Sequence, residues 1–164
     1  MLNNVKMFIS EDALRRRVFE LGRHIRKDVG DKQITLICVF NEAFDFGKDL
    51  MLAIGGDVRV IFVSKADFNQ EWSHRNQELL EGACILIQDI VDSGQTLLSL
   101  IQSVKSQAID KVLSVCLLNK KCNRIVDVEP DYTGFSIPDE YVVGYGMGLK
   151  GKFNNLRHIA FYSP

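Results

Sequence analysis

Short apolar segments alternate with helical segments along most of this chain, and this alternation restricts the possible folds more than any other feature. The apolar segments are rich in β-branched residues, which is typical of strands buried on both faces of a sheet. They cover residues 34–40, 58–63, 83–87 and 111–118. Between them, apolar residues recur at helical spacing. The pattern predicts an α/β fold with a mainly parallel sheet flanked by helices.

The first helix is predicted to begin at Ser10 and to end at Gly30. Ser10 is a good N-cap, and the acidic residues that follow it suit the positive end of the helix dipole. Several arginines lie between the apolar positions of this helix. A basic face can bind nucleic acid, but the formal net charge of −1 favours a solvated face, and we expect no nucleic-acid partner.

Length and composition indicate one globular domain over residues 1–164, because the chain has 46% hydrophobic residues and no linker-like segment. No apolar run is long enough to cross a membrane, and the N-terminus does not resemble a signal peptide. Three of the four cysteines lie inside apolar runs, as buried reduced thiols do. These features predict a cytoplasmic protein.

The polar segment from Ser64 to Asn76 is predicted to be a loop or a short irregular helix. After Lys120, proline and glycine residues divide the chain into short strands and turns. Residues 141–145 and 158–162 are predicted to be two final strands.

The segment from Cys84 to Leu98 carries the pattern most indicative of chemistry. A buried strand leads to Asp89 and Asp92, then to a Ser-Gly-Gln-Thr turn, and then to a helix. Parallel sheets bind ligands beyond the carboxyl ends of their strands. The glycine lets the backbone approach an anion, while hydroxyl groups and the first helical amides supply donors. We therefore expect a phosphate monoester to bind at Ser93, Gly94, Gln95 and Thr96.

An ordinary strand-to-helix connection, with Ser93 or Thr96 as the helix cap, would give a similar pattern. The lysine of a Walker P-loop is absent. Asp89 and Asp92 could face ribose hydroxyls, water bound to a magnesium ion, or a proton in transit.

Residues 84–97 resemble the phosphoribosyl-pyrophosphate loop of type I phosphoribosyltransferases. Residues 130–146 resemble the purine-binding hood of the hypoxanthine-guanine branch of that family, and residues 153–159 and 9–25 continue the resemblance. The likeness covers nearly the whole chain. It implies a type I phosphoribosyltransferase fold, with a small hood made from the N- and C-terminal segments.

The resemblance implies a role for each residue of this region. The turn Ser93–Thr96 would hold the 5′-phosphate, and Asp92 would lie near the purine N7 as the catalytic base or acid. Gln88 and Asp89 would lie on the ribose and metal side, with Asp89 as the ligand of Mg²⁺.

The purine would be bound by three further residues. Lys120 would donate to the 6-oxo group, Tyr141 would stack on the ring, and the backbone of Val142 would contact the ring edge. Simpler interpretations exist for two of them. Lys120 could be a solvated lysine at a strand end, and Tyr141 could be a half-buried aromatic residue of a strand.

The implied activity is transfer of the 5-phosphoribosyl group from phosphoribosyl pyrophosphate to N9 of hypoxanthine or guanine, a purine-salvage reaction that uses Mg²⁺. The resemblance also implies a homo-oligomer.

The sequence departs from the family at the positions that would bind pyrophosphate and metal. Gln88 replaces a glutamate, and the loop between Val63 and Leu79 is short and lacks the family's Ser-Tyr pair. Further replacements are Asn41 and Glu42 for a lysine-glycine turn, Gly148 for an aspartate and Asn154 for an arginine.

Two interpretations follow. The protein is either a transferase of weak activity or a lapsed transferase that binds a purine nucleotide or a protein partner. Compensating groups are present in the sequence: Lys150, Lys152 or Arg157 could replace the lost cation, and Glu42 could hold the metal.

Overall fold

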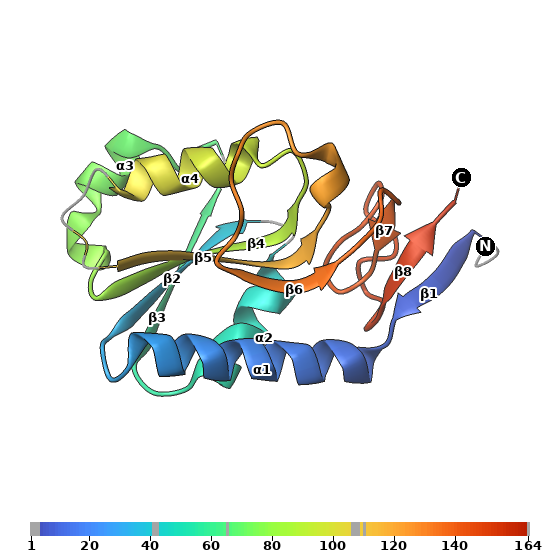
Figure 1. Cartoon of the computed structure of the whole chain (residues 1–164), viewed down its shortest axis with the longest axis horizontal. Helices are drawn as coiled ribbons and strands as arrows, with labels where there is room; N and C mark the ends of the chain where they lie inside the picture. Colours follow the sequence, from blue (N-terminus) through green and yellow to red (C-terminus); the bar gives the residue numbers. More distant parts are fainter. Residues whose placement is uncertain (1–3, 41–42, 65, 106–108, 110, 164) are drawn as a thin grey trace.

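A five-stranded parallel sheet forms the centre of the molecule (Figure 1). The computed structural model describes residues 4–163 except 41–42, 65, 106–108 and 110. The strand order is β3-β2-β4-β5-β6, and every neighbouring pair is parallel. The strands are β2 (Ile34–Phe40), β3 (Val58–Ser64), β4 (Ala83–Val91), β5 (Lys111–Asn119) and β6 (Tyr132–Ser136). The predicted α/β sheet is confirmed.

Helices cover both faces of this sheet. Helices α1 (Glu11–Val29) and α2 (Phe44–Ile54) lie below it in Figure 1, and α3 (Gln70–Arg75) and α4 (Gln95–Lys105) lie above it. Alternate residues of β4 serve the two layers, since Ile85 and Ile87 pack in the cluster with α1 and α2. Cys84 and Leu86 pack in the opposite cluster with Leu100 of α4. Burial on both faces explains the uninterrupted apolar strands.

Helix α1 begins and ends where the sequence predicts. The hydroxyl of Ser10 accepts a hydrogen bond from the amide of Ala13 at 3.2 Å, and Gly30, with φ of 71°, forms the C-cap. Contrary to the expectation of a solvated face, the arginines of this helix do not all point into solvent. The guanidinium of Arg17 donates to the carbonyls of Gly134 and Thr133 at 2.9 and 2.8 Å. The helix is thereby fastened to β6.

A second, antiparallel sheet unites the two ends of the chain. Its order is β1-β8-β7, with β1 (Val5–Ile9), β7 (Val142–Val143) and β8 (Ile159–Tyr162). Figure 1 shows it beyond the end of β6, with both chain termini beside it. The predicted hood from the N- and C-terminal segments is confirmed.

Several details differ from the sequence prediction. β1 was not expected, and residues 132–136 form the fifth strand of the main sheet instead of part of the hood. The strand predicted over residues 141–145 shrinks to β7, because Gly144 turns the chain with φ of 102° directly against the carbonyl of His158. The polar segment after β3 contains α3 and a 3₁₀ turn, Gln77–Leu79, and a second such turn covers Lys121–Asn123.

Three thiols are buried and unpaired, as expected: Cys38, Cys84 and Cys116. Burial raises the pKa of each to about 12, so these thiols stay protonated and unreactive at neutral pH. No helix in the described part of the chain is both long and apolar enough to cross a membrane.

The contact between α1 and α2 gives a prediction for stability. A Cβ atom on Gly22 would lie 2.5 Å from the Cβ of Ala53 and 2.8 Å from the amide nitrogen of Ile54. Gly22→Ala should therefore push the helices apart and lower the free energy of unfolding by about 1–3 kcal/mol. Urea denaturation of this variant and of Arg16→Ala, on the exposed face of the same helix, measures the difference. Equal stability of the two variants would contradict the close packing described.

Candidate functional site

The turn Asp92–Gly94 joins the carboxyl end of β4 to the first residue of α4, Gln95. The Ser93 hydroxyl accepts from the amide of Gln95 at 3.4 Å, and the Gly94 carbonyl accepts from the amide of Leu98 at 2.9 Å. The turn therefore lies at the edge of the sheet where parallel α/β folds bind ligands, beside the electropositive start of a helix.

A small cavity of about 90 Å³ adjoins this turn. Five residues singled out in the sequence line it together: Gln88, Asp92, Ser93, Gly94 and Thr96. The side-chain oxygen of Gln88 is buried and has no hydrogen-bond partner among the described residues. A buried acceptor of this kind is commonly satisfied by a ligand or a water molecule.

Asp89 lies outside the lining of that cavity. Successive residues of a strand face opposite sides, which separates Asp89 from Gln88. One oxygen of Asp89 accepts from the amide of Ile90 at 2.7 Å. The described residues contain no group of three or more acidic, histidine or cysteine side chains that could hold a metal. Magnesium needs fewer, because it is often bound by one or two carboxylates together with substrate phosphates. Asp89 fits that arrangement.

The loop over residues 120–131 covers the turn. The amide of Ile125 donates to the Ser93 carbonyl at 2.9 Å. Gly94 has φ of 83°, and a Cβ atom on it would lie 2.8 Å from Val128 and 2.9 Å from Arg124. Glycine is thus required at this position by the packing of the loop as well as by the backbone conformation.

Arg124 is a residue of this region that the sequence did not reveal. Its guanidinium donates to the carbonyl of Asp92 at 2.6 Å and to the side-chain oxygen of Asn119 at 2.6 Å. Glu129 lies 3.6 Å from the same guanidinium and accepts from the Asn119 amide at 3.1 Å. The sequence feature that could have pointed to this group is Asn119, a polar residue at the end of an otherwise apolar strand.

Opposing effects act on the pKa of the Glu129 carboxyl group, and together they favour its charged form. Burial acts to raise its pKa, but the hydrogen bond from Asn119 and the positive charges of Arg124 and Lys121 outweigh that effect. The net result is a lowered pKa.

Lys120 lies beside the turn, because its amide donates to the Val91 carbonyl at 2.9 Å. The residue is buried, so it is not the solvated lysine of the simpler interpretation. Its ammonium lies 3.8 Å from Asp139, which also accepts from the side-chain amide of Asn123 at 2.8 Å. At 3.8 Å, the carboxylate leaves this shielded ammonium able to donate to a ligand carbonyl.

Tyr141 precedes β7 and is 49% exposed. Its ring meets Tyr162 edge to face, with the ring centres 6.1 Å apart, and Tyr162 contacts Phe153 in turn. Val142 is buried and pairs with Phe161 of β8. The ring of Tyr141 is therefore accessible to a ligand, and the small sheet holds the backbone beside it in place.

The positions expected to bind pyrophosphate are less complete. Asn41 and Glu42 lie outside the described residues. Gly148 lies between two tight turns, Gly144–Met147 and Leu149–Lys152, and a Cβ atom on it would lie 2.9 Å from the Lys152 carbonyl. The Asn154 carbonyl accepts from the amide of Gly146 at 3.0 Å, and the Asn154 side chain is exposed.

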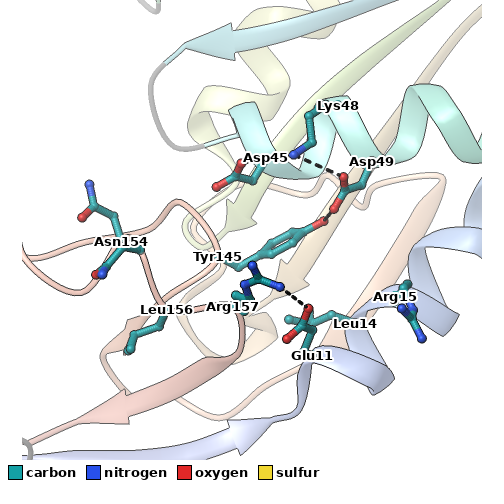
Figure 2. A pocket seen from close by; sticks show the side chains of 11 residues that line it. Glu11, Leu14, Arg15, Asp45, Lys48, Asp49, Tyr145, Asn154, Leu156 and Arg157 are labelled. Carbon is teal, nitrogen blue, oxygen red and sulfur yellow. Dashed lines mark hydrogen bonds and ion pairs between the residues drawn. The ribbon is translucent and has the colours of Figure 1, made fainter.

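Figure 2 shows Asn154 at a larger cavity of about 340 Å³ between the start of α1, α2 and the C-terminal segment. Its charged groups neutralise one another. Lys48 lies 3.6 Å from Asp49, and Arg157 lies 3.5 Å from Glu11. The hydroxyl of Tyr145 donates to Asp49 at 2.6 Å, and burial together with that carboxylate raises the pKa of the phenol. Arg157 is therefore paired with Glu11, although its side chain is exposed, and Lys150 and Lys152 are exposed as well.

Comparisons with known proteins identify the family to which the chain belongs. Residues 9–150 match the family described as the phosphoribosyl transferase domain. The hypoxanthine-guanine phosphoribosyltransferase of Bacillus subtilis is 31% identical, over 97% of this chain and 93% of its own length. The bifunctional protein TilS/HprT of Listeria monocytogenes is 32% identical, but the chain spans only 26% of its length.

A solved structure supports the same assignment. The hypoxanthine-guanine phosphoribosyltransferase of Leishmania tarentolae, crystallised with guanosine monophosphate (GMP), superimposes with a TM-score of 0.88. The match has 26% identity and covers 99% of both chains. The fold, the turn after β4 and these relatives lead to one conclusion: the chain belongs to the phosphoribosyl transferase domain family, in its hypoxanthine-guanine branch.

Proposed function

We propose that residues 1–164 act as one domain that transfers the 5-phosphoribosyl group from phosphoribosyl pyrophosphate to N9 of hypoxanthine or guanine. The main support is the position of two groups with complementary chemistry. The phosphate-binding turn follows β4 and Lys120 follows β5, and the hydrogen bond from Lys120 to Val91 holds these strand ends together.

The phosphate end of the nucleotide would bind at Ser93, Gly94, Gln95 and Thr96. The hydroxyl groups and the amides at the start of α4 would donate to the 5′-phosphate. Asp92 is exposed beside this turn, within reach of a bound base. The related enzyme crystallised with GMP is consistent with a site for a purine nucleotide.

The purine end would bind between Tyr141 and Lys120. The open face of Tyr141 would stack on the ring, the ammonium of Lys120 would donate to the 6-oxo group, and the Val142 backbone would contact the ring edge. In the reaction, a bond forms between N9 and C1′ of the ribose while the bond from C1′ to pyrophosphate breaks. Pyrophosphate leaves with the electron pair, and Asp92 accepts the proton that the purine loses at N7.

Magnesium would be held by Asp89 together with oxygens of the substrate. When bound, it supplies positive charge that stabilises the departing pyrophosphate. The side-chain oxygen of Gln88 would face the ribose side of the cavity and accept from a hydroxyl group, which would satisfy its buried acceptor.

A second candidate function is nucleotide binding without efficient transfer. The observation that favours it is the pyrophosphate side of the site. The described part of that side has an exposed amide, Asn154, in place of a cation, and a crowded glycine, Gly148, in place of a carboxylate.

The proposed setting is the cytoplasm, where thiols remain reduced and purine salvage substrates are available. A homo-oligomer is the proposed assembly. No nucleic acid or membrane is required by the proposed chemistry.

The proposed function is tested by measuring binding and turnover on one preparation. We expect calorimetric titration to detect GMP binding, and we expect turnover with phosphoribosyl pyrophosphate, Mg²⁺ and hypoxanthine to lie well below roughly ten per second. Absence of one well-placed donor can cost about a hundredfold in rate. Asn154→Arg should therefore raise the turnover, whereas Asn155→Arg, with the same charge change on the exposed neighbour, should not.

Failure of the wild-type protein to bind GMP would contradict the proposed function. Turnover at the usual enzymatic rate would instead show that other groups already stabilise pyrophosphate, and only the expectation of weak activity would be lost.

Recognition of the oxopurine predicts a selective effect of Lys120→Met. The variant should bind GMP roughly tenfold to a hundredfold more weakly, which is the range for hydrogen bonds to charged groups. Binding of adenosine monophosphate should change little, since its 6-amino group offers no acceptor to the lysine. Lys121→Met, which removes an exposed charge from the next residue, is the matched control. Equal losses of affinity for both nucleotides would show that Lys120 contributes only general positive charge.

The conformation of Gly94 predicts that Gly94→Val abolishes most nucleotide binding. The new side chain would be strained at φ of 83° and would displace Val128 and Arg124, so the turn could not keep its shape. We expect GMP affinity to fall at least about tenfold. Gly30→Val introduces similar backbone strain at φ of 71° in open space far along α1, and should lower stability without changing affinity. Unchanged GMP affinity in Gly94→Val would argue against this binding position.

A further inference from the structure

Three side chains form a hydrogen-bonded group behind the phosphate-binding turn: Asn119, Arg124 and Glu129. Asn119 is fully buried, and the side chain of Arg124 is only 13% exposed. A guanidinium withdrawn from water needs acceptors, because an unpaired buried charge is strongly destabilising. Its two terminal nitrogens find them in the Asp92 carbonyl and the Asn119 side chain, each at 2.6 Å, whereas its buried Nε has no acceptor among the described residues.

The contact with Asp92 has a directional consequence for the turn. The peptide group is planar and trans, so the carbonyl of Asp92 and the amide of Ser93 point in opposite directions. Because Arg124 holds the carbonyl on the loop side, the Ser93 amide points away from the loop. The next peptide is held in the same way, since the Ser93 carbonyl accepts from Ile125 at 2.9 Å and the Gly94 amide must point away. Successive amides with fixed directions form an anion-binding concavity.

Asn119 and Glu129 fix the guanidinium itself. The planar guanidinium presents its donors in a rigid fork, so anchoring one end sets the direction of the other. Asn119 accepts from one terminal nitrogen and donates to Glu129 at 3.1 Å, while Glu129 supplies the opposite charge 3.6 Å from the guanidinium. The orientation of Arg124 is thus set by β5 and the loop, independently of any ligand.

We propose that Arg124 is a positioning residue that orients the Asp92–Ser93 peptide toward the 5′-phosphate, with Asn119 and Glu129 holding its guanidinium. This inference rests on the proposed function of the site. Arg124 acts through the backbone of the turn and need not touch the ligand. Its contribution therefore belongs to the phosphate and not to the base.

The test compares GMP with guanosine, which lacks the phosphate. Arg124→Met keeps an unbranched apolar stem against Gly94 but removes the donors to Asp92. We expect the affinity for GMP to fall roughly tenfold or more, the usual effect of losing a hydrogen bond to a charged group. The affinity for guanosine should stay within about twofold. Lys121→Met, which removes another positive charge near Glu129, should leave both affinities unchanged.

The comparison separates positioning from general stability. A merely structural role would lower the melting temperature and weaken both ligands alike, and that result would overturn the inference, as would unchanged GMP affinity. If Arg124→Met does not fold, Asn119→Ala provides the second test, since it frees the guanidinium without removing it. It should show the same selective loss for GMP, and equal losses for GMP and guanosine would overturn the inference. A wild-type protein that binds neither ligand would contradict the proposed function instead.

Discussion

The parallel pairing of β4 with β5 is the constraint on which the rest of the site depends. Register places Val91 opposite Asn119, so both strands end at the same level of the sheet. The turn that follows one strand and the lysine that follows the other are then neighbours without any further adjustment. The contacts made by the loop over residues 120–131 are built on strand ends whose separation the sheet has already fixed.

The main sheet could be predicted from the sequence because its strands are buried on both faces. Double burial leaves an uninterrupted apolar run, and the helices between such runs require parallel pairing. β1 gave no such signal, since Lys6 and Met7 are exposed. β6 was harder to assign, because its membership of the main sheet depends on pairing with β5 across a long loop.

The candidate site also contains parts that could be predicted from the sequence and parts that could not. The proposed phosphate-binding turn is local, because its strand, turn and helix are consecutive. The structure brings Gln88, Ser93, Gly94 and Thr96 to one cavity, whereas Gln95 lies outside its lining. Arg124 could not be found, because its partners Asp92 and Asn119 come from other elements. The opposite orientation of Asp89 follows from strand geometry but carries no signature in residue type. The roles expected for Lys120 and Tyr141 came from the family resemblance, because their residue types alone do not indicate a purine site.

The turn around Gly148 bears on how such a site can change over evolutionary time. The backbone packs so closely there that a Cβ atom on Gly148 would lie 2.9 Å from the Lys152 carbonyl. A carboxylate at this position would therefore require the neighbouring Leu149–Lys152 turn to shift. The exposed position of Asn154 carries no such barrier. Two departures that look equivalent in the sequence therefore differ in the structural change that reversing each of them would require.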